Sequence, residues 1–223
     1  MTSPIIESDL RFLRQMDAVN MRQLSQLNIT LIGCGAIGST TAMWLGKMGV
    51  GNIILFDDDN VETHNWSNQM YREVDIGKPK VQALQEVMSE FGLQSPKIVS
   101  ERYSDQTLSE VVISGVDSMR SRKIIWKSVH KTPSVKLYID ARMGLETLMV
   151  FAVNPQTRDS RISYSKSLYS DEAATPEPCT ARTIAYTPLM ASSIICNIVK
   201  RYANQEYIPE KIVLDLATYT LIV

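Results

Sequence analysis

The fold is decided by residues 28–38, which read NITLIGCGAIG. The apolar run Ile29 to Ile32 predicts a short buried strand. It ends at a G-x-G-x-x-G pattern, which is formed by Gly33, Gly35 and Gly38. Glycines at the first two positions let the chain turn tightly and bring backbone N–H groups close to a ligand. The stretch therefore indicates a nucleotide-binding turn.

The residues after the turn predict the next two elements of such a fold. Apolar residues at helical spacing predict a helix over Ala36 to Met48, and Gly49 stands where a C-cap glycine is expected. Asn52 to Phe56 predicts a second strand that delivers Asp57, 24 residues after the first glycine. This separation is close to the roughly 20 residues expected for an acidic group that binds ribose hydroxyls. We therefore expect a ligand that contains phosphate and ribose.

The glycine pattern can be compared with two common nucleotide-binding classes. A Walker loop requires G-x-x-x-x-G-K-[ST], and Ser39 stands where its lysine is needed. The sequence is therefore not that of a P-loop NTPase. A nicotinamide-dependent oxidoreductase, which uses the same glycines and an acid such as Asp57, stays open on this pattern alone.

Three further blocks follow in order: Asp57-x-Asp59-x-Val61, Asn65-Trp66-Ser67-Asn68-Gln69 and Gly77-Lys78-Pro79-Lys80-Val81. They resemble the D-x-D-x-V, N-L-x-R-Q and G-x-x-K-V/A blocks of the ThiF/MoeB/HesA and ubiquitin-activating-enzyme family. Near the N-terminus, Arg11-Phe12-Leu13-Arg14-Gln15 is similar to the family's R-Y-x-R-Q. The resemblance covers most of the chain.

The resemblance implies roles for several charged side chains. Asp57 and Asp59 would hold the nucleotide, and Lys80 would bind its phosphates in place of the absent Walker lysine. Asp117 would hold Mg²⁺, because carboxylates at the C-terminal ends of parallel strands face the ligand crevice. The alternative for Asp117 is a cap for the following helix. Arg14 would reach the ATP of a neighbouring subunit, which implies a homodimer, although on the residues alone it reads as a solvated arginine.

The polar block from 65 to 69 carries both a match and a departure. Asn65 and Gln69 can donate amide hydrogen bonds to phosphate or ribose, and the alternative is a satisfied turn. Asn68 stands where the family has arginine. Because an amide cannot replace a full charge, either Arg72 takes this role or the nucleotide is bound more weakly.

The chain has three cysteines, Cys34, Cys179 and Cys196, and no C-x-x-C pair, so we expect no structural zinc. Cys179 lies in a long polar segment, 166–183, that predicts a loop, with Arg182 three residues on. A thiol in that setting can be partly ionised, which makes Cys179 the candidate nucleophile for a thioester; the alternative is an ordinary free cysteine. Cys196 falls in an apolar helix and is assigned to the core.

Composition excludes several classes of protein. With 44% hydrophobic residues among 223, the chain can bury a full core without metal or disulfide. A net charge of −1 with scattered Lys and Arg gives no footprint for nucleic acid, and no apolar run is long enough for a membrane span. The polar, acidic N-terminus is unlike a signal peptide, so we expect a cytoplasmic protein.

The pattern as a whole predicts an α/β fold of Rossmann type: a mostly parallel sheet with helices on both faces and antiparallel strands toward the C-terminus. Helices are expected at 79–91, 120–130 and 189–199, and strands at 97–100, 111–116, 136–140, 147–154, 161–165 and 211–216. We expect one domain over 1–223, divided into N-terminal helices (1–27), a nucleotide-binding core (28–145) and antiparallel strands with a cysteine loop (146–223).

The function implied by the resemblance is adenylation of a carboxylate with ATP and Mg²⁺. The substrate would be the C-terminal glycine of a ubiquitin-like or sulfur-carrier protein, and a thioester on Cys179 would follow if that cysteine is active. Two alternatives stay open: an NAD-dependent oxidoreductase, which leaves Lys80 and Asp117 without a role, and a non-catalytic partner subunit, which Asn68 favours.

Overall fold

The computed structural model describes residues 7–169 and 184–223, which form one eight-stranded sheet flanked by helices. The strands are β1 (Asn28–Ile32), β2 (Asn52–Phe56), β3 (Lys97–Val99), β4 (Val111–Ser114), β5 (Leu137–Gly144), β6 (Thr147–Val153), β7 (Lys211–Asp215) and β8 (Thr220–Ile222). Their order across the sheet is β3-β2-β1-β4-β5-β6-β7-β8. The first five are parallel, and β5 to β8 pair antiparallel, so the predicted fold class is confirmed.

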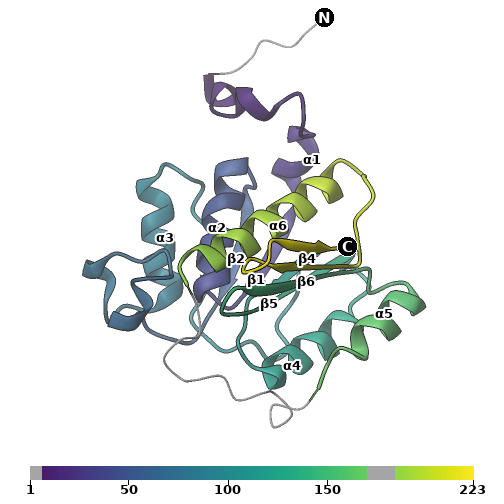
Figure 1. The fold of residues 1–223 in the computed structure, drawn as a ribbon. Helices are drawn as coiled ribbons and strands as arrows, with labels where there is room; N and C mark the ends of the chain where they lie inside the picture. The colour runs from purple at the N-terminus through teal and green to yellow at the C-terminus, as the bar shows by residue number, and fades with distance from the viewer. Residues whose placement is uncertain (1–6, 170–183) are drawn as a thin grey trace, which may run out of the picture.

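The helices cover both faces of this sheet. They are η1 (Glu7–Gln15), α1 (Met21–Gln26), α2 (Ala36–Met48), η2 (Thr63–Asn65), η3 (Glu73–Asp75), α3 (Lys80–Glu90), α4 (Met119–Val129), α5 (Arg158–Ser165) and α6 (Tyr186–Ala203). Alternate strand residues point to opposite sides, so β1, β2, β4, β5 and β6 contribute to two apolar clusters. One cluster packs against α1, α2, α3 and α6, and the other against α4 and α5 (Figure 1).

The sheet changes direction of growth at β1. This strand pairs with β2 on one side and with β4 on the other, both parallel. In open α/β sheets, ligands bind at such a switch point, outside the carboxyl ends of the strands. The chain segments that leave β1, β2 and β4 therefore define the place where a ligand is expected.

One predicted strand is wrong: residues 161–165 belong to the helix α5. Alternating Ile162 and Tyr164 suggested a strand, but Ile162 is exposed and the buried pair is Ser160 and Tyr164. Four residues apart, these two lie on one helical face. Tyr164 packs edge-on against Trp126 of α4, with ring centroids 4.7 Å apart.

Other predicted boundaries shift by a few residues. The fourth strand ends at Ser114 rather than Val116, the fifth extends to Gly144, and the last helix spans Tyr186–Ala203. Cys196 is buried in that helix as predicted. Part of the predicted loop 166–183, from 170 onward, lies outside the described residues.

The N-terminal segment η1 is a 3-10 helix that stands away from the sheet (Figure 1). Gln15 fixes its end, because its side-chain Nε2 donates to the Met48 carbonyl, 2.6 Å away, at the C-terminus of α2. The apolar side chains of Leu10, Leu13 and Met16 are exposed on this single chain. Because residues three apart eclipse in a 3-10 helix, these three side chains form one stripe.

The loop between β2 and α3 is tied down by a cluster of ion pairs centred on Asp75, which is fully buried. Arg72 donates to both oxygens of the Asp75 carboxylate, at 2.6 and 2.8 Å, and Lys78 Nζ lies 3.2 Å from it. Lys78 also pairs with Glu86 of α3 at 2.5 Å. The two carboxylate partners hold Lys78 against α3.

Replacing Asp75 with asparagine is expected to lower the free energy of unfolding by about 2 kcal/mol at pH 7, because charged hydrogen bonds to Arg72 are lost. These bonds lower the pKa of Asp75 from 3.8 to about 2. Because the pKa is lower in the folded state, the carboxylate stabilises the fold at pH values above the pKa of the unfolded state. This stabilisation is lost as the pH falls through the pKa of the folded state. Urea unfolding should therefore show the difference between the two proteins vanish between about pH 4 and pH 2; a constant difference would contradict the assignment.

Candidate functional site

The turn after β1 is built from three glycines in mutual contact. Gly33 has φ +91°, and its N–H donates to the Phe56 carbonyl at the end of β2. A Cβ added to Gly38 would lie 1.8 Å from the Gly33 carbonyl oxygen, and one added to Gly33 would lie 3.0 Å from Gly115. Gly115, which follows β4, was not singled out in the sequence. Close packing of α2 on the strand ends thus requires glycine at 33 and 38. A Cβ added to Gly115 would lie 3.2 Å from the Gly33 carbonyl oxygen, and we call these three residues the glycine corner.

Gly35 differs from the three residues of the glycine corner. A Cβ added there would meet nothing within 4 Å, so open space lies beside it. Gly35 is the N-cap of α2 and has no side chain to satisfy the first amides of that helix. The first turn of α2 carries no acidic residue. Unsatisfied amides and the positive end of a helix dipole make this a suitable place for a phosphate group.

Asp57, at the end of β2, holds the glycine turn in shape. Its Oδ2 accepts from the Cys34 N–H at 2.6 Å, and its Oδ1 accepts from the Asp59 N–H at 2.8 Å. Burial raises the pKa of Asp57, although the nearby Lys80 opposes this. The residue therefore has a structural job beside the predicted contact with ribose, and it reaches the switch point as predicted.

Lys80 provides the positive charge at this site. It opens α3, and its Nζ lies 2.7 Å from Asp59 Oδ2 while its N–H donates to the Asp59 carbonyl at 2.9 Å. The lysine side chain is only 9% exposed, whereas that of Asp59 is 61% exposed. Burial lowers the pKa of Lys80, but the hydrogen bond to Asp59 and the Asp57 charge outweigh it, and the pKa is raised. Lys80 is therefore a cation at neutral pH.

The loop from 65 to 71 lies against the glycine turn. The Tyr71 hydroxyl donates to the Cys34 carbonyl at 2.6 Å, and the Met70 N–H donates to Ser39 Oγ at 3.1 Å. Between these anchors and η2, the side-chain oxygens of Asn68 and Gln69 are buried and have no hydrogen-bond partner. Buried polar atoms of this kind call for a ligand or water. Tyr71 was missed by sequence reasoning.

Asn65 contributes differently from Asn68 and Gln69. Its side-chain oxygen accepts from the Glu62 N–H at 2.8 Å, which closes a turn. The structure therefore agrees with the alternative reading of Asn65 as a satisfied turn residue. Its neighbours at 68 and 69 are the ones with vacant acceptor atoms.

Asp117 lies in the turn between β4 and α4, two residues after Gly115, and is exposed. The helix cap is supplied by Ser118, whose Oγ accepts from the Ser121 N–H at 3.1 Å. Ser118 therefore fills the capping role that was the alternative for Asp117. Asp57, Asp58 and Asp59 add further carboxylate oxygens within 4.8 Å of one another.

Two predicted site residues are not brought to this place within one chain. Arg14 is exposed on η1, next to Gln15, which contacts the C-terminal end of α2. The glycine corner is at the other end of that 13-residue helix, about 20 Å away at 1.5 Å per residue. Cys179 lies outside the described residues. The other two thiols, of Cys34 and Cys196, are buried, and burial raises the pKa of each.

The profile of the ThiF family matches residues 7–222. The chain belongs to the ThiF family. Ubiquitin-like modifier-activating enzyme 5 of Arabidopsis thaliana is 25% identical to this ThiF-family chain over 181 residues, which are 78% of the chain and 40% of the relative. The ThiF-family chain spans 25% to 40% of the length of the first curated relatives it matches.

Two solved structures have the fold of this ThiF-family chain. PaaA superposes with a TM-score of 0.76 at 18% identity, covering 100% of the chain and 75% of PaaA. E. coli MccB, solved with AMPCPP and MccA, gives a TM-score of 0.71 at 17% identity, covering 91% of the chain and 64% of MccB. At these identities the likeness shows the fold alone.

Within this ThiF-family chain, Arg72 does not lie free to stand in for the arginine absent at position 68. Its guanidinium is held by Asp75, Glu86 and Glu90, all on the loop and α3 side. The geometry therefore does not support Arg72 as the substitute for an arginine at position 68, which is occupied by the neutral Asn68.

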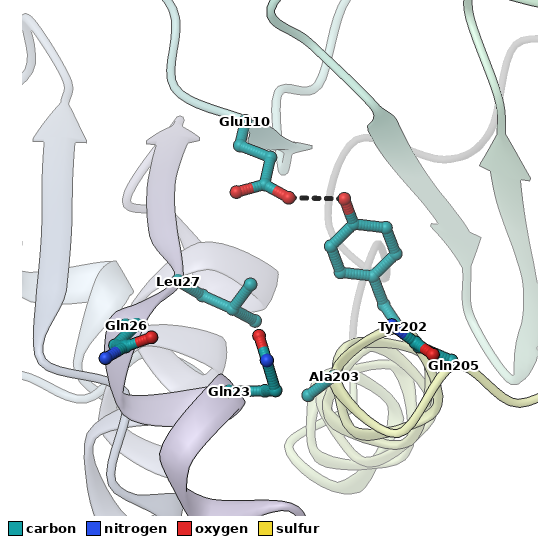
Figure 2. A pocket seen from close by; sticks show the side chains of 7 residues that line it. All are labelled: Gln23, Gln26, Leu27, Glu110, Tyr202, Ala203 and Gln205. Atoms are coloured by element: carbon teal, nitrogen blue, oxygen red, sulfur yellow. Dashed lines mark hydrogen bonds between the residues drawn. The ribbon is translucent and has the colours of Figure 1, made fainter.

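A cavity of about 360 Å³ in the ThiF-family chain lies at the end of the sheet opposite the glycine corner (Figure 2). Tyr202 of α6 donates to Glu110, just before β4, at 2.5 Å across one side of it. The remaining lining residues are Gln23, Gln26, Leu27, Ala203 and Gln205. None of the predicted site residues lines this cavity. Within residues 7–169 and 184–223, no helix has both the length and the apolar character needed to cross a membrane.

Proposed function

We propose that the chain uses ATP to adenylate the C-terminal carboxylate of a ubiquitin-like or sulfur-carrier protein. One observation carries the proposal: the buried cation of Lys80, paired with Asp59, lies within electrostatic reach of Asp57, which in turn binds the glycine turn at a switch point. A phosphate-sized anion there would meet helix amides and a lysine together. Membership of the ThiF family and the similarity to ubiquitin-like modifier-activating enzyme 5 support the reaction class.

In this reaction, a carboxylate oxygen of the partner attacks the α-phosphorus of ATP. The bond between that phosphorus and the bridging oxygen to the β-phosphate breaks, and pyrophosphate leaves. Lys80 and the amides at Gly35 would stabilise the negative charge on the phosphates, since positioning and charge neutralisation dominate such displacements. The vacant oxygens of Asn68 and Gln69 would accept hydrogen bonds from the nucleotide or its water.

The residues also fit a Mg²⁺ ion. Asp117 is exposed and follows Gly115 by two residues, and hard cations prefer carboxylate oxygens. When bound, Mg²⁺ would neutralise charge on the triphosphate. Asp117 would hold it, while Asp59, paired with Lys80, stays with the lysine.

Arg14 would complete the site from a second subunit. Within its own chain it lies at the far end of α2, so it cannot reach the glycine corner without a partner. The exposed stripe of Leu10, Leu13 and Met16 on the same helix supports a homodimer contact there. Cys179 would accept the acyl group as a thioester, with AMP as leaving group; it lies outside the described residues.

A non-catalytic partner subunit is the second candidate. The observation that favours it is Asn68, a neutral residue whose buried oxygen has no partner where the family has arginine. Such a subunit would keep the fold and have no turnover. A nicotinamide oxidoreductase is less well supported, because hydride transfer leaves Asp117 and the amide block at 65–69 without a role.

The test is exchange of labelled pyrophosphate into ATP with the purified chain, Mg²⁺ and a panel of ubiquitin-like proteins that end in glycine. We expect exchange with at least one panel member, and its loss when that member lacks its terminal glycine. ATP binding without any exchange would favour the non-catalytic subunit. Protection against heat by NAD, and not by ATP with Mg²⁺, would overturn the proposal.

A further inference from the structure

A buried charged network occupies the face of β5 that is covered by α4 and α5. Asp140 is fully buried and receives two arginines: Arg122 Nε at 3.0 Å and Arg142 Nε at 2.8 Å. The Tyr164 hydroxyl donates to the same carboxylate at 3.0 Å. The side chains of Arg122 and Arg142 are 5% and 14% exposed. An ionisable cluster inside an otherwise apolar layer costs desolvation energy, so its retention needs an explanation beyond packing.

The two arginines extend from Asp140 in different directions. Arg122 also donates to the Val116 carbonyl at 2.5 Å and to the Ala141 carbonyl at 3.2 Å. Arg142 instead donates to the carbonyl and hydroxyl of Ser167, both at 2.9 Å. Arg122 is therefore the member that ties the network to the turn between β4 and α4.

The turn held by Arg122 is the one that carries Asp117. Val116, the residue whose carbonyl is bound, immediately precedes Asp117. The same turn begins with Gly115, which belongs to the glycine corner and packs against Gly33 and Gly38. Asp117 is exposed, and its backbone lies between the Val116 carbonyl held by Arg122 and Ser118, the N-cap of α4.

We propose that Arg122, anchored by Asp140, is a positioning residue that aims Asp117 at the metal-bound nucleotide. The inference rests on the proposed function, because it assigns Arg122 a task only if Asp117 holds Mg²⁺. Outer-shell groups that orient a metal-binding carboxylate commonly change metal affinity when replaced. Arg122 is not itself in contact with the ligand; it acts through the backbone at Val116.

The experiment measures binding of a fluorescent ATP analogue by the full chain, with Mg²⁺ and with EDTA. Arg122→Lys keeps a cation for Asp140 but lacks the planar fork needed to reach the Val116 carbonyl as well. We expect it to weaken the apparent Mg²⁺ affinity about tenfold or more, while analogue affinity in EDTA stays unchanged. Arg142→Lys is the matched control: it alters the same Asp140 cluster on the Ser167 side, and we expect both affinities within about twofold of the parent.

Each outcome decides something. If Asp117→Asn loses the Mg²⁺ effect and Arg122→Lys keeps it, the positioning inference is wrong and the proposed function stands. Equal loss in both lysine variants would show general damage to the network and also overturn the inference. If the parent chain binds the analogue no better with Mg²⁺, the proposed metal role fails and takes the inference with it. Should Arg122→Lys not fold, Asp140→Asn, which weakens the anchor without changing its shape, replaces it in the same comparison.

Discussion

Alanine at position 38 is expected to abolish nucleotide binding and to lower the free energy of unfolding by about 3 kcal/mol or more. The added methyl would lie 1.8 Å from the Gly33 carbonyl, which is backbone and cannot rotate away. In an ordinary helix, replacing glycine with alanine raises the free energy of unfolding by up to about 1 kcal/mol. A decrease at position 38 would therefore point to the steric clash. Urea unfolding and titration with a fluorescent ATP analogue measure the two effects.

Gly35→Ala is the matched control, three residues earlier in the same motif. Nothing lies within 4 Å of an added Cβ there, so the fold should hold within about 1 kcal/mol of the parent. Binding of the analogue should still weaken if phosphate approaches the amides at this position. A Gly38→Ala chain that is as stable as Gly35→Ala would contradict the packing described for the glycine corner.

The second large effect is expected at Lys80, in pyrophosphate exchange with the partner protein found active. Lys80→Met should lower the exchange rate about 100-fold or more, the usual loss when one group that stabilises transition-state charge is removed. Folding should be kept, because the abandoned partner, Asp59, is largely exposed and can be solvated. Lys78→Met is the control, since Lys78 pairs with Asp75 and Glu86 and should leave the rate near that of the parent.

The same variant tests the arginine supplied by a second subunit. Mixing Lys80→Met with Arg14→Ala, each inactive alone, should restore exchange, because a mixed dimer has one site with both intact residues. Random pairing of equal amounts gives about a quarter of the parent sites. No recovery after the subunits have been shown to exchange would rule out the trans role of Arg14.

The β1–α2–β2 unit could be predicted closely because its signals are local. Glycines that permit a turn, a helical apolar pattern and an acid after the second strand all lie within 30 residues, and each agrees with the others. The contact of Gly33 with Gly115 could not be read in this way, because it joins two strands that are far apart in the sequence. Only the sheet order places them together.

The errors have the same origin. Five residues of α5 fit a period of two as well as a helical period, and what decides is the aromatic layer of Trp126, Tyr138 and Phe151 that receives Tyr164. Asn65 has the right residue type for a ligand contact, but its oxygen closes a local turn. Asp140 could be recognised in the sequence as an ionisable residue in an apolar strand. Its two partners, Arg122 and Arg142, lie outside the predicted strand 136–140, so the pattern did not reveal them.

The glycine corner limits how this protein can change. The groups offered to a ligand are the main-chain amides at the start of α2, which every residue carries, while the corner leaves no room for a side chain at Gly38 and has a left-handed backbone at Gly33. Substitutions at these positions therefore cannot alter phosphate recognition gradually. A change in ligand preference therefore has to come from neighbouring residues that do carry side chains, such as Asn68 and Gln69.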